Sequence, residues 1–309
     1  MPNTPLDPLP PVYDFPFKAI FTQQRVLANF LAAVTKKPES LFEGLVLADP
    51  QLMPLHQDDK LTVPDIRARV PGWDAAVEMQ RLYTPEAANR QLFRMGRMIV
   101  GQLKESGRYD AMPKVAEILI ASRFRIFNDG RYHHYFELTD ADSGLIYPNS
   151  PLVVTVDLQN LPLIDDGTPL WSWGKFLNSN KTTEFEALRA RSEAMAEAVS
   201  TLFGFSADEL NRINAERHEL ALMDQAIRME YSHAKGREEG RQEGRQEGRQ
   251  EGRQEGRQEG REEGRQEGRQ EGREEGRAEI ALTMLRRGWS TADISDFTGL
   301  TETEVKALL

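Results

Sequence analysis

Two segments of alternating apolar and polar residues lie on either side of a Pro-Gly dipeptide in the first third of the chain. The segments cover residues 61–69 and 75–80, and the dipeptide is Pro71-Gly72. Alternation places successive side chains on opposite faces of a strand, and Pro-Gly is a common turn sequence. The pattern therefore predicts a β-hairpin.

Helical and strand-like patterns precede and follow this hairpin. One helix is predicted to begin at Asp14, with an apolar face formed by Phe17, Ile20, Phe21, Leu27, Phe30, Leu31 and Val34, and a second is predicted over 86–106 after Pro85. Further strands are predicted over 44–48, 115–121, 132–138 and 152–158. The run 115–121 is almost wholly apolar and is expected to be a central strand. A helix between two such strands implies a crossover connection and hence an α/β fold with a mixed sheet.

Acidic and amide side chains gather on the predicted hairpin. Glu78 and Gln80 are two residues apart and share a face of one strand, and Asp65 lies across from them on the other. Mg²⁺ binds hard oxygen ligands, and it takes one or two carboxylates from a protein and the rest from water and phosphate. The hairpin thus predicts a magnesium site suited to phosphodiester hydrolysis. The alternative, in which these three side chains form a solvated strand face beside a proline bend, stays open.

The polar face of the predicted helix over 86–106 is strongly basic. It carries five cations against two acids, namely Arg90, Arg94, Arg97, Lys104 and Arg108 against Glu86 and Glu105. DNA phosphates are expected to contact this face. A solvated helix face is the alternative.

The last third of the chain changes character. A helix is predicted over 184–203 and ends at Gly204, and Ser206 to Glu209 reads as a capping box that starts another helix reaching about residue 232. Residues 236–277 repeat Gly-Arg-Gln/Glu-Glu, with 11 arginines and 13 glutamates and no apolar residue. Glycine costs ~1 kcal/mol per helical site relative to alanine, so a frayed helix or coil acting as a spacer is expected, with oligomerisation as the second interpretation.

Residues 278–309 regain apolar periodicity and are similar to a minimal helix-turn-helix. The last predicted helix has only one cation, Lys306, against Glu302 and Glu304. Base reading is therefore not expected, and a partner or self-association module is preferred.

Composition and net charge limit the partners and the cellular compartment expected for this chain. The net charge of −10 argues against indiscriminate binding of nucleic acid, so any DNA contact must be local. The chain has no cysteine, no apolar run long enough for a membrane helix, and an N-terminal segment without the features of a signal peptide. A cytoplasmic protein without membrane contact is expected.

The order Pro64-Asp65, spacer, Glu78-x-Gln80 resembles the PD-(D/E)XK nuclease signature. It resembles most closely the Rpn family of recombination-promoting nucleases, also described as transposases, in which Gln likewise occupies the Lys position. The supporting context is Asp14 to Phe21 before the motif, Arg90 and Gln102 after it, and Trp171 to Leu177 further on, so that the resemblance covers roughly residues 13–235.

The resemblance implies an αβββαβ core and a Mg²⁺-dependent DNA endonuclease linked to recombination or mobile elements. Asp65 and Glu78 would be metal ligands with the Met79 carbonyl as a third, and Gln80 would orient the attacking water. Gln80 carries no positive charge, so Lys60 or Lys18 is expected to supply it. Asp14, which reads from the sequence as a helix N-cap, would flank the active site with Lys18.

The domain organisation expected from these patterns has five parts. They are a proline-rich arm over 1–12, a nuclease domain over 13–180, a helical extension over 181–235, the repeat over 236–277 and the small module over 278–309. The competing functional hypothesis is a fold that is catalytically weak or inactive and acts by binding DNA or protein partners. The substitution of Gln80 for lysine, the acidic net charge and the long repeat motivate this second hypothesis.

Overall fold

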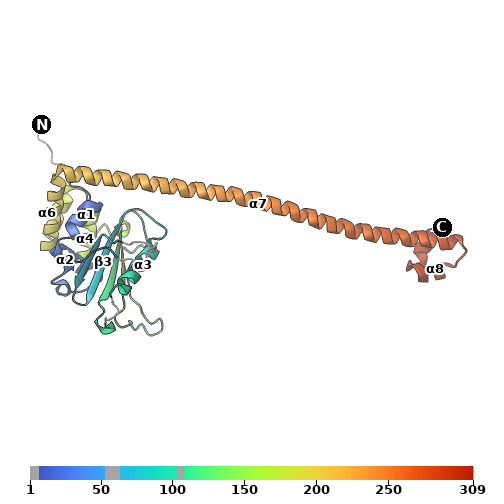
Figure 1. The fold of residues 1–309 in the computed structure, drawn as a ribbon, viewed down its shortest axis with the longest axis horizontal. Helices are drawn as coiled ribbons and strands as arrows, with labels where there is room; N and C mark the ends of the chain where they lie inside the picture. The colour runs from blue at the N-terminus through green and yellow to red at the C-terminus, as the bar shows by residue number, and fades with distance from the viewer. Residues whose placement is uncertain (1–6, 53–62, 103–107, 309) are drawn as a thin grey trace. The chain divides into compact units, whose positions relative to one another are not determined.

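The computed structural model describes residues 7–52, 63–102 and 108–308, and within these ranges six strands form one mixed sheet (Figure 1). The strands are β1 (Val46–Leu47), β2 (Ile66–Val70), β3 (Trp73–Gln80), β4 (Lys114–Ala121), β5 (His133–Phe136) and β6 (Leu152–Asp157). Their order across the sheet is β1-β2-β3-β4-β6-β5. The three central strands β3, β4 and β6 are parallel, whereas the other pairs are antiparallel. The predicted mixed sheet and hairpin are confirmed.

Helices cover both faces of this sheet. The described helices are α1 (Asp14–Phe21), α2 (Gln24–Thr35), α3 (Ala87–Val100), α4 (Pro169–Asn178), α5 (Thr182–Arg189), α6 (Glu193–Ala207), α7 (Glu209–Arg286), α8 (Thr291–Thr298) and α9 (Glu302–Ala307), with short 3₁₀ turns at Glu39–Phe42, Tyr109–Ala111 and Leu158–Asn160. Strands β1, β2 and β3, helix α3 and strand β4 follow one another as expected for an αβββαβ core. The first helix of that core is present as two helices, α1 and α2.

Alternation along the strands divides the core between the two faces. Val77 and Ile118 pack with apolar residues of α1, α2, α4, α5 and α6 in the main core. The neighbouring positions Ala76 and Leu119 face the other way and pack against residues of α3. Because Glu78 is two residues from Ala76, and Glu117 is two residues from Leu119, both acids lie on the face that α3 covers.

The N-terminal helical segment is two helices where the sequence pattern predicted one. Thr22 is the C-cap of α1, and its hydroxyl donates to the carbonyl oxygens of Lys18 and Ala19 at 2.7 and 3.3 Å. The N-cap is Tyr13, which makes no side-chain capping bond, so the capping role predicted for Asp14 is wrong. Asp14 lies instead in the first turn of α1.

The segment that follows the α/β core also differs from the prediction. The predicted helix over 184–203 is interrupted between α5 and α6, where Ser192 caps α6 by accepting a hydrogen bond from the Met195 N–H at 3.0 Å. Ser206 does not cap α7, because its hydroxyl oxygen accepts the Leu9 N–H at 2.9 Å. Asp208 takes that role and accepts the Asn211 N–H at 2.8 Å.

Contacts divide the chain into two compact units, residues 1–226 and 227–309, and α7 begins in the first unit and continues through the second. The repeat is α-helical and lies within α7, whereas the sequence analysis expected a frayed helix or coil. Residues 236–275 are exposed throughout. Local ion pairs such as Arg241 with Glu238 (3.0 Å) lie along it. In the second unit Ala281, Ile294 and Val305 form a small buried cluster.

The hairpin turn gives a direct test of how the fold depends on one backbone conformation. Gly72 has a φ of +80°, in the left-handed region, and nothing would contact an added Cβ. Gly96 is in the helical interior of α3, also with open space for a Cβ. We expect Gly72→Ala to lower the free energy of unfolding by about 1 kcal/mol and the matched Gly96→Ala to raise it by up to about 1 kcal/mol.

Urea unfolding of both variants, followed by tryptophan fluorescence, measures this difference. Equal effects of the two substitutions would contradict the role of the turn, since both add the same methyl group in open space.

Candidate active site

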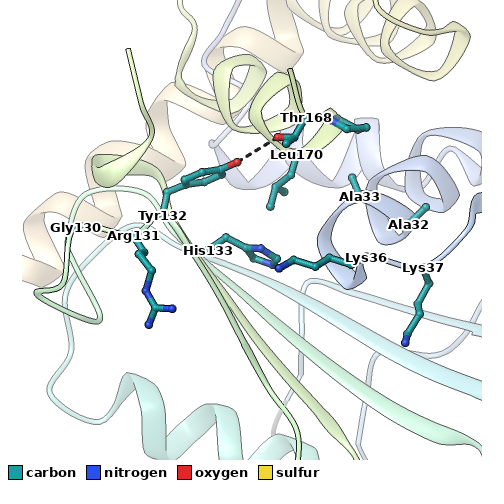
Figure 2. A pocket seen from close by; sticks show the side chains of 11 residues that line it. Ala32, Ala33, Lys36, Lys37, Gly130, Arg131, Tyr132, His133, Thr168 and Leu170 are labelled. Atoms are coloured by element: carbon teal, nitrogen blue, oxygen red, sulfur yellow. Dashed lines mark hydrogen bonds between the residues drawn. The ribbon is translucent and has the colours of Figure 1, made fainter. Parts of the chain in front are cut away.

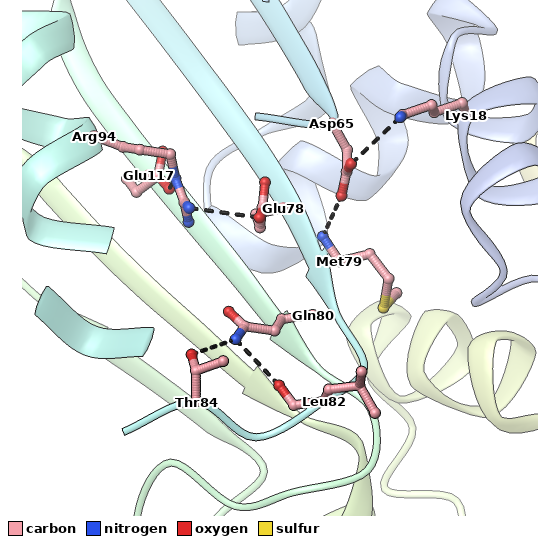
Figure 3. Close-up of polar contacts among 9 residues, drawn as sticks. All are labelled: Lys18, Asp65, Glu78, Met79, Gln80, Leu82, Thr84, Arg94 and Glu117. Carbon is pink, nitrogen blue, oxygen red and sulfur yellow. Dashed lines mark hydrogen bonds and ion pairs between the residues drawn. The ribbon is translucent and has the colours of Figure 1, made fainter. Parts of the chain in front are cut away.

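The hairpin register brings the acids of the two strands together. In β2 and β3 Ile66 pairs with Val77, so Asp65 and Glu78 are the next facing positions. The Asp65 Oδ2 atom accepts a hydrogen bond from the Met79 N–H at 2.8 Å, as Figure 3 shows. This bond fixes the carboxylate beside the second strand. The preceding residue, Pro64, is buried, which anchors the entry to β2.

Helix α1 supplies a cation to the same carboxylate. The Lys18 Nζ atom lies 3.6 Å from Asp65 Oδ1 (Figure 3). The same atom lies 2.7 Å from Asp14 Oδ1. Lys18 and Asp14 are one turn apart on the helix, so they form a pair on one helix face. The structure therefore brings together Asp14, Lys18 and Asp65, which the sequence analysis associated with one site.

Helix α3 places an arginine between two other acids. The Arg94 Nε atom lies 2.6 Å from Glu117 Oε1, and its Nη1 atom lies 3.5 Å from Glu78 Oε1. Arg94 is 2% exposed and Glu117 is fully buried. The exposed helix face predicted for Arg94 is therefore wrong, because the side chain points into the protein toward two carboxyl groups.

Burial controls the ionisation of these acids. Burial raises the pKa of Glu78 to about 7 against the opposing effect of Arg94, and the nearby Asp65 raises it further. Burial also raises the pKa of Asp65, although the Met79 N–H and Lys18 oppose this. Burial raises the pKa of Glu117 even beside Arg94. One arginine cannot fully compensate two buried carboxylates, so protons are retained in this cluster near neutral pH.

Gln80 is held with its amide oxygen available. Its Nε2 atom donates to the carbonyl oxygen of Leu82 at 3.1 Å and to the hydroxyl oxygen of Thr84 at 2.8 Å (Figure 3). A carbonyl oxygen only accepts, so Leu82 requires the NH₂ group on that side and fixes the orientation of the amide. The Gln80 Oε1 atom is buried and has no hydrogen-bond partner in the part of the chain that the structure describes.

The remaining predicted site residues are spread more widely. Arg90 is exposed on α3 and close enough to Glu78 to oppose the rise in its pKa, and Arg97 is partly exposed on the same helix. Gln102 follows the C-terminal end of α3, with both side-chain polar atoms buried and without a hydrogen-bond partner. Lys60 lies outside the described residues.

The donor set suits a cation held by two carboxylates. Among the described residues no group of three or more His, Cys, Asp or Glu side chains is arranged to hold a metal ion. However, the Glu78 Oε2 atom is buried near the Asp65 carboxylate and has no hydrogen-bond partner among the described residues. An unpaired buried carboxylate oxygen is costly, and a divalent cation would satisfy it. The residues present therefore fit a divalent metal.

A separate cavity of about 720 Å³ lies near the C-terminal end of α2, the start of α4 and strand β5 (Figure 2). None of the predicted site residues lines it. His133 lines it and lies 2.9 Å from the carbonyl oxygen of Val34 through its Nε2 atom. Burial and the charge of Lys36 lower the pKa of His133 to about 4, so the ring is neutral near pH 7 and serves as a structural donor.

Sequence reasoning missed Glu117. Glu117 is a single acid within an otherwise apolar stretch of β4. A charge on a strand that is buried on both faces needs a partner, so this isolated acid could have indicated a buried ion pair. The identity of that partner, Arg94, depends on how α3 packs on the sheet, which no local pattern specifies.

A mixed sheet that carries an aspartate and a Glu-x-Gln motif on adjacent strands has the arrangement of the PD-(D/E)XK class. A family model described as "PD-(D/E)XK nuclease family transposase" matches residues 11–232, and the chain belongs to this family. The resemblance seen in the sequence is thus confirmed, and the family supports a nuclease-like function. Searches of curated proteins and of solved structures gave no match. No helix in the described ranges has the length and apolar character needed to cross a membrane.

The raised pKa of Glu78 predicts how stability depends on pH without metal. The folded protein keeps this proton up to about pH 7, whereas the unfolded chain loses it near 4.5. Between these values the folded state binds more protons, so the free energy of unfolding falls as the pH rises, by about 2 kcal/mol.

Urea unfolding in EDTA at pH 5, 6, 7 and 8 measures this slope. Glu78→Gln should reduce this slope, with Asp65 and Glu117 supplying what remains, while Glu43→Gln, at an exposed position, should leave it unchanged. A wild-type free energy of unfolding that rises over this interval would contradict the assignment.

Proposed function

We propose that this chain is a Mg²⁺-dependent endonuclease that hydrolyses phosphodiester bonds in DNA. The observation that carries the proposal is the meeting of Asp65 and Glu78 across the β2–β3 hairpin, with one buried Glu78 oxygen lacking a partner. Strongly perturbed carboxyl groups in one cluster are typical of catalytic sites. Membership of the PD-(D/E)XK family supports the same reaction class.

Asp65 and Glu78 would hold the cation, with the backbone carbonyl of Met79 as a further oxygen ligand. When bound, the metal would supply charge stabilisation at the phosphate and lower the pKa of a bound water. The Met79 N–H keeps Asp65 oriented by its hydrogen bond at 2.8 Å. Arg94 and Glu117 keep Glu78 oriented from the side of α3.

Gln80 would hold the attacking water. Its free Oε1 atom can accept a hydrogen bond from the water, because the NH₂ group is already committed to Leu82 and Thr84. Lys18 would supply positive charge near the phosphate by exchanging part of its contact with Asp65. Lys60 retains the same proposed role from the sequence, and Arg90 and Arg97 are proposed to contact DNA.

The alternative function is a weakly active or inactive fold that binds DNA or protein. One observation favours it, namely that Lys18 and Arg94 already pair with the carboxylates that would bind metal. The endonuclease proposal also includes a link to recombination or mobile elements. It further includes self-association through residues 236–309. Plasmid cleavage separates the two functions.

Purified full-length protein should nick supercoiled plasmid in Mg²⁺ and not in EDTA. We expect Asp65→Asn and Glu78→Gln each to reduce the rate by about a hundredfold or more, because each removes one anionic metal ligand. Glu43→Gln and Asp142→Asn are matched controls at exposed positions and should retain the wild-type rate. Cleavage that persists in both site variants would disprove this site, and metal-independent binding of DNA without cleavage by the wild type would support the alternative.

The role of Gln80 has its own test. Gln80→Leu removes the free amide oxygen and should lower the single-turnover rate by about a hundredfold, the usual size of a lost proton-handling group. Thr84→Val is the control, because it removes one acceptor of the Gln80 NH₂ group while Leu82 still fixes the amide. If the threonine variant lost as much activity as the leucine variant, Gln80 would act only through packing.

A further inference from the structure

The loop that follows β4 borders the candidate site. Residues 122–126 leave the sheet at the end of β4, and the Ser122 N–H donates to the carbonyl oxygen of Gln80 at 3.0 Å. Gln80 and Ala121 are paired in the parallel register of β3 and β4. The loop therefore begins one strand away from the residue proposed to hold the water.

An aromatic anchor holds the loop in place. Phe124 is buried in an apolar cluster with Ala87 of α3 and with Leu119 and Ala121 of β4. Its ring lies 5.7 Å from that of Tyr83 in an edge arrangement. The residues on either side of it, Arg123 and Arg125, are exposed. Burial of the middle residue thus presents the two flanking guanidinium groups to solvent from a fixed backbone.

These two arginines differ from other cations near the site. Arg94 and Lys18 are paired with carboxylates, and Arg81 is buried against Glu219 with its guanidinium over the Tyr13 ring. Within the described ranges no acidic side chain lies within 4 Å of the Arg123 or Arg125 guanidinium groups. Arg125 lies close enough to Asp157, at the end of β6, to oppose the rise that burial causes in the pKa of that carboxyl group, and Arg123 lies close enough to Arg81 to add to the lowering that burial causes in the pKa of that arginine. Because neither forms an ion pair with a carboxylate of the described residues, both guanidinium groups can bind an external anion.

Helix α3 adds a third exposed arginine beside them. Ala87, in the first turn of α3, shares the apolar cluster of Phe124, so this end of the helix and the loop lie side by side. Arg90 is one turn further along α3, is exposed, and acts electrostatically on Glu78. Arg90 thus lies near the carboxylate cluster, and Arg123 and Arg125 lie on the loop that begins beside Gln80 and packs against the first turn of α3.

We propose that Arg123 and Arg125 bind backbone phosphates of the substrate DNA next to the cleaved bond, with Arg90 completing the contact. The inference rests on the proposed function, because it takes DNA as the ligand. A polyanion fits this surface, since the chain as a whole has a net charge of −10 and would repel DNA elsewhere. Arginine forms charge-assisted hydrogen bonds with phosphate, and a rigid loop reduces the entropy lost on binding.

Metal-free binding tests this inference separately from cleavage. Fluorescence anisotropy of a labelled DNA duplex is measured in EDTA over a series of KCl concentrations, with full-length wild type and the Arg123→Gln/Arg125→Gln double variant. Loss of two phosphate contacts should reduce the slope of log K against log salt by about 1.8 and weaken binding at low salt by about a hundredfold. The Arg123→Lys/Arg125→Lys variant should keep the wild-type slope, because it keeps both charges.

The matched control is Arg189→Gln, which removes an arginine paired with Glu186 on α5 and should change neither slope nor affinity. An unchanged slope in the glutamine double variant, an equal loss in Arg189→Gln, or no binding of DNA by the wild type at any salt concentration would overturn the inference. In Mg²⁺ the glutamine double variant should raise KM with little change in the single-turnover rate at saturating DNA. If the wild type binds through these arginines but does not cleave, the inference stands and the proposed endonuclease function fails.

Discussion

The site depends on one hydrogen bond, from the Met79 N–H to the Asp65 carboxylate. Asp65 precedes the first paired residue of β2, where the ladder no longer dictates the direction of a side chain. The bond replaces that lost constraint and holds the carboxylate against the second strand. Glu78 needs no such device, because it is within β3 and its direction follows from the alternation of the strand. The pair thus combines one acid positioned by the sheet and one positioned by a backbone amide.

Burial of these acids is unfavourable for the apo protein, and the surrounding cations offset only part of it. Arg94 is shared between Glu78 and Glu117, and Lys18 is shared between Asp14 and Asp65. Buried carboxylates that share a cation are destabilising relative to a fully paired or apolar arrangement. Such a cluster is therefore expected to serve binding or catalysis and not the stability of the fold. Binding of a divalent cation would relieve the electrostatic cost, and this connects the local instability to the proposed reaction.

Local sequence patterns predicted the hairpin, because it follows from the two-residue period and the Pro71-Gly72 turn. They also placed Asp65 near Glu78, but they did not predict the hydrogen bond from the Met79 N–H that orients its carboxylate. They failed where long-range contacts decide. The breaks at Thr22 and Ser192 divide predicted helices, and apolar periodicity does not register them, although Ser192 carries the side-chain acceptor that caps the next helix. Arg94 seemed to belong to a basic surface because its partners, Glu78 and Glu117, come from strands distant in sequence. Sequence spacing can place residues on one helix face, but it does not say which face is buried.

Local charge environment also explains why a strongly acidic chain can present a surface for DNA. The 11 arginines of residues 236–277 stand among 13 glutamates, so their fields largely cancel beyond a Debye length of roughly 8–10 Å. Arg123 and Arg125 lie on either side of a buried phenylalanine, and among the described residues neither forms an ion pair, although Arg125 interacts electrostatically with Asp157. Two arginines on a fixed loop with one nearby carboxylate therefore produce a stronger local potential than many compensated charges in a repeat. The acidic remainder of the chain then favours approach of a polyanion at this one edge, which is the edge that carries Gln80 and the two carboxylates.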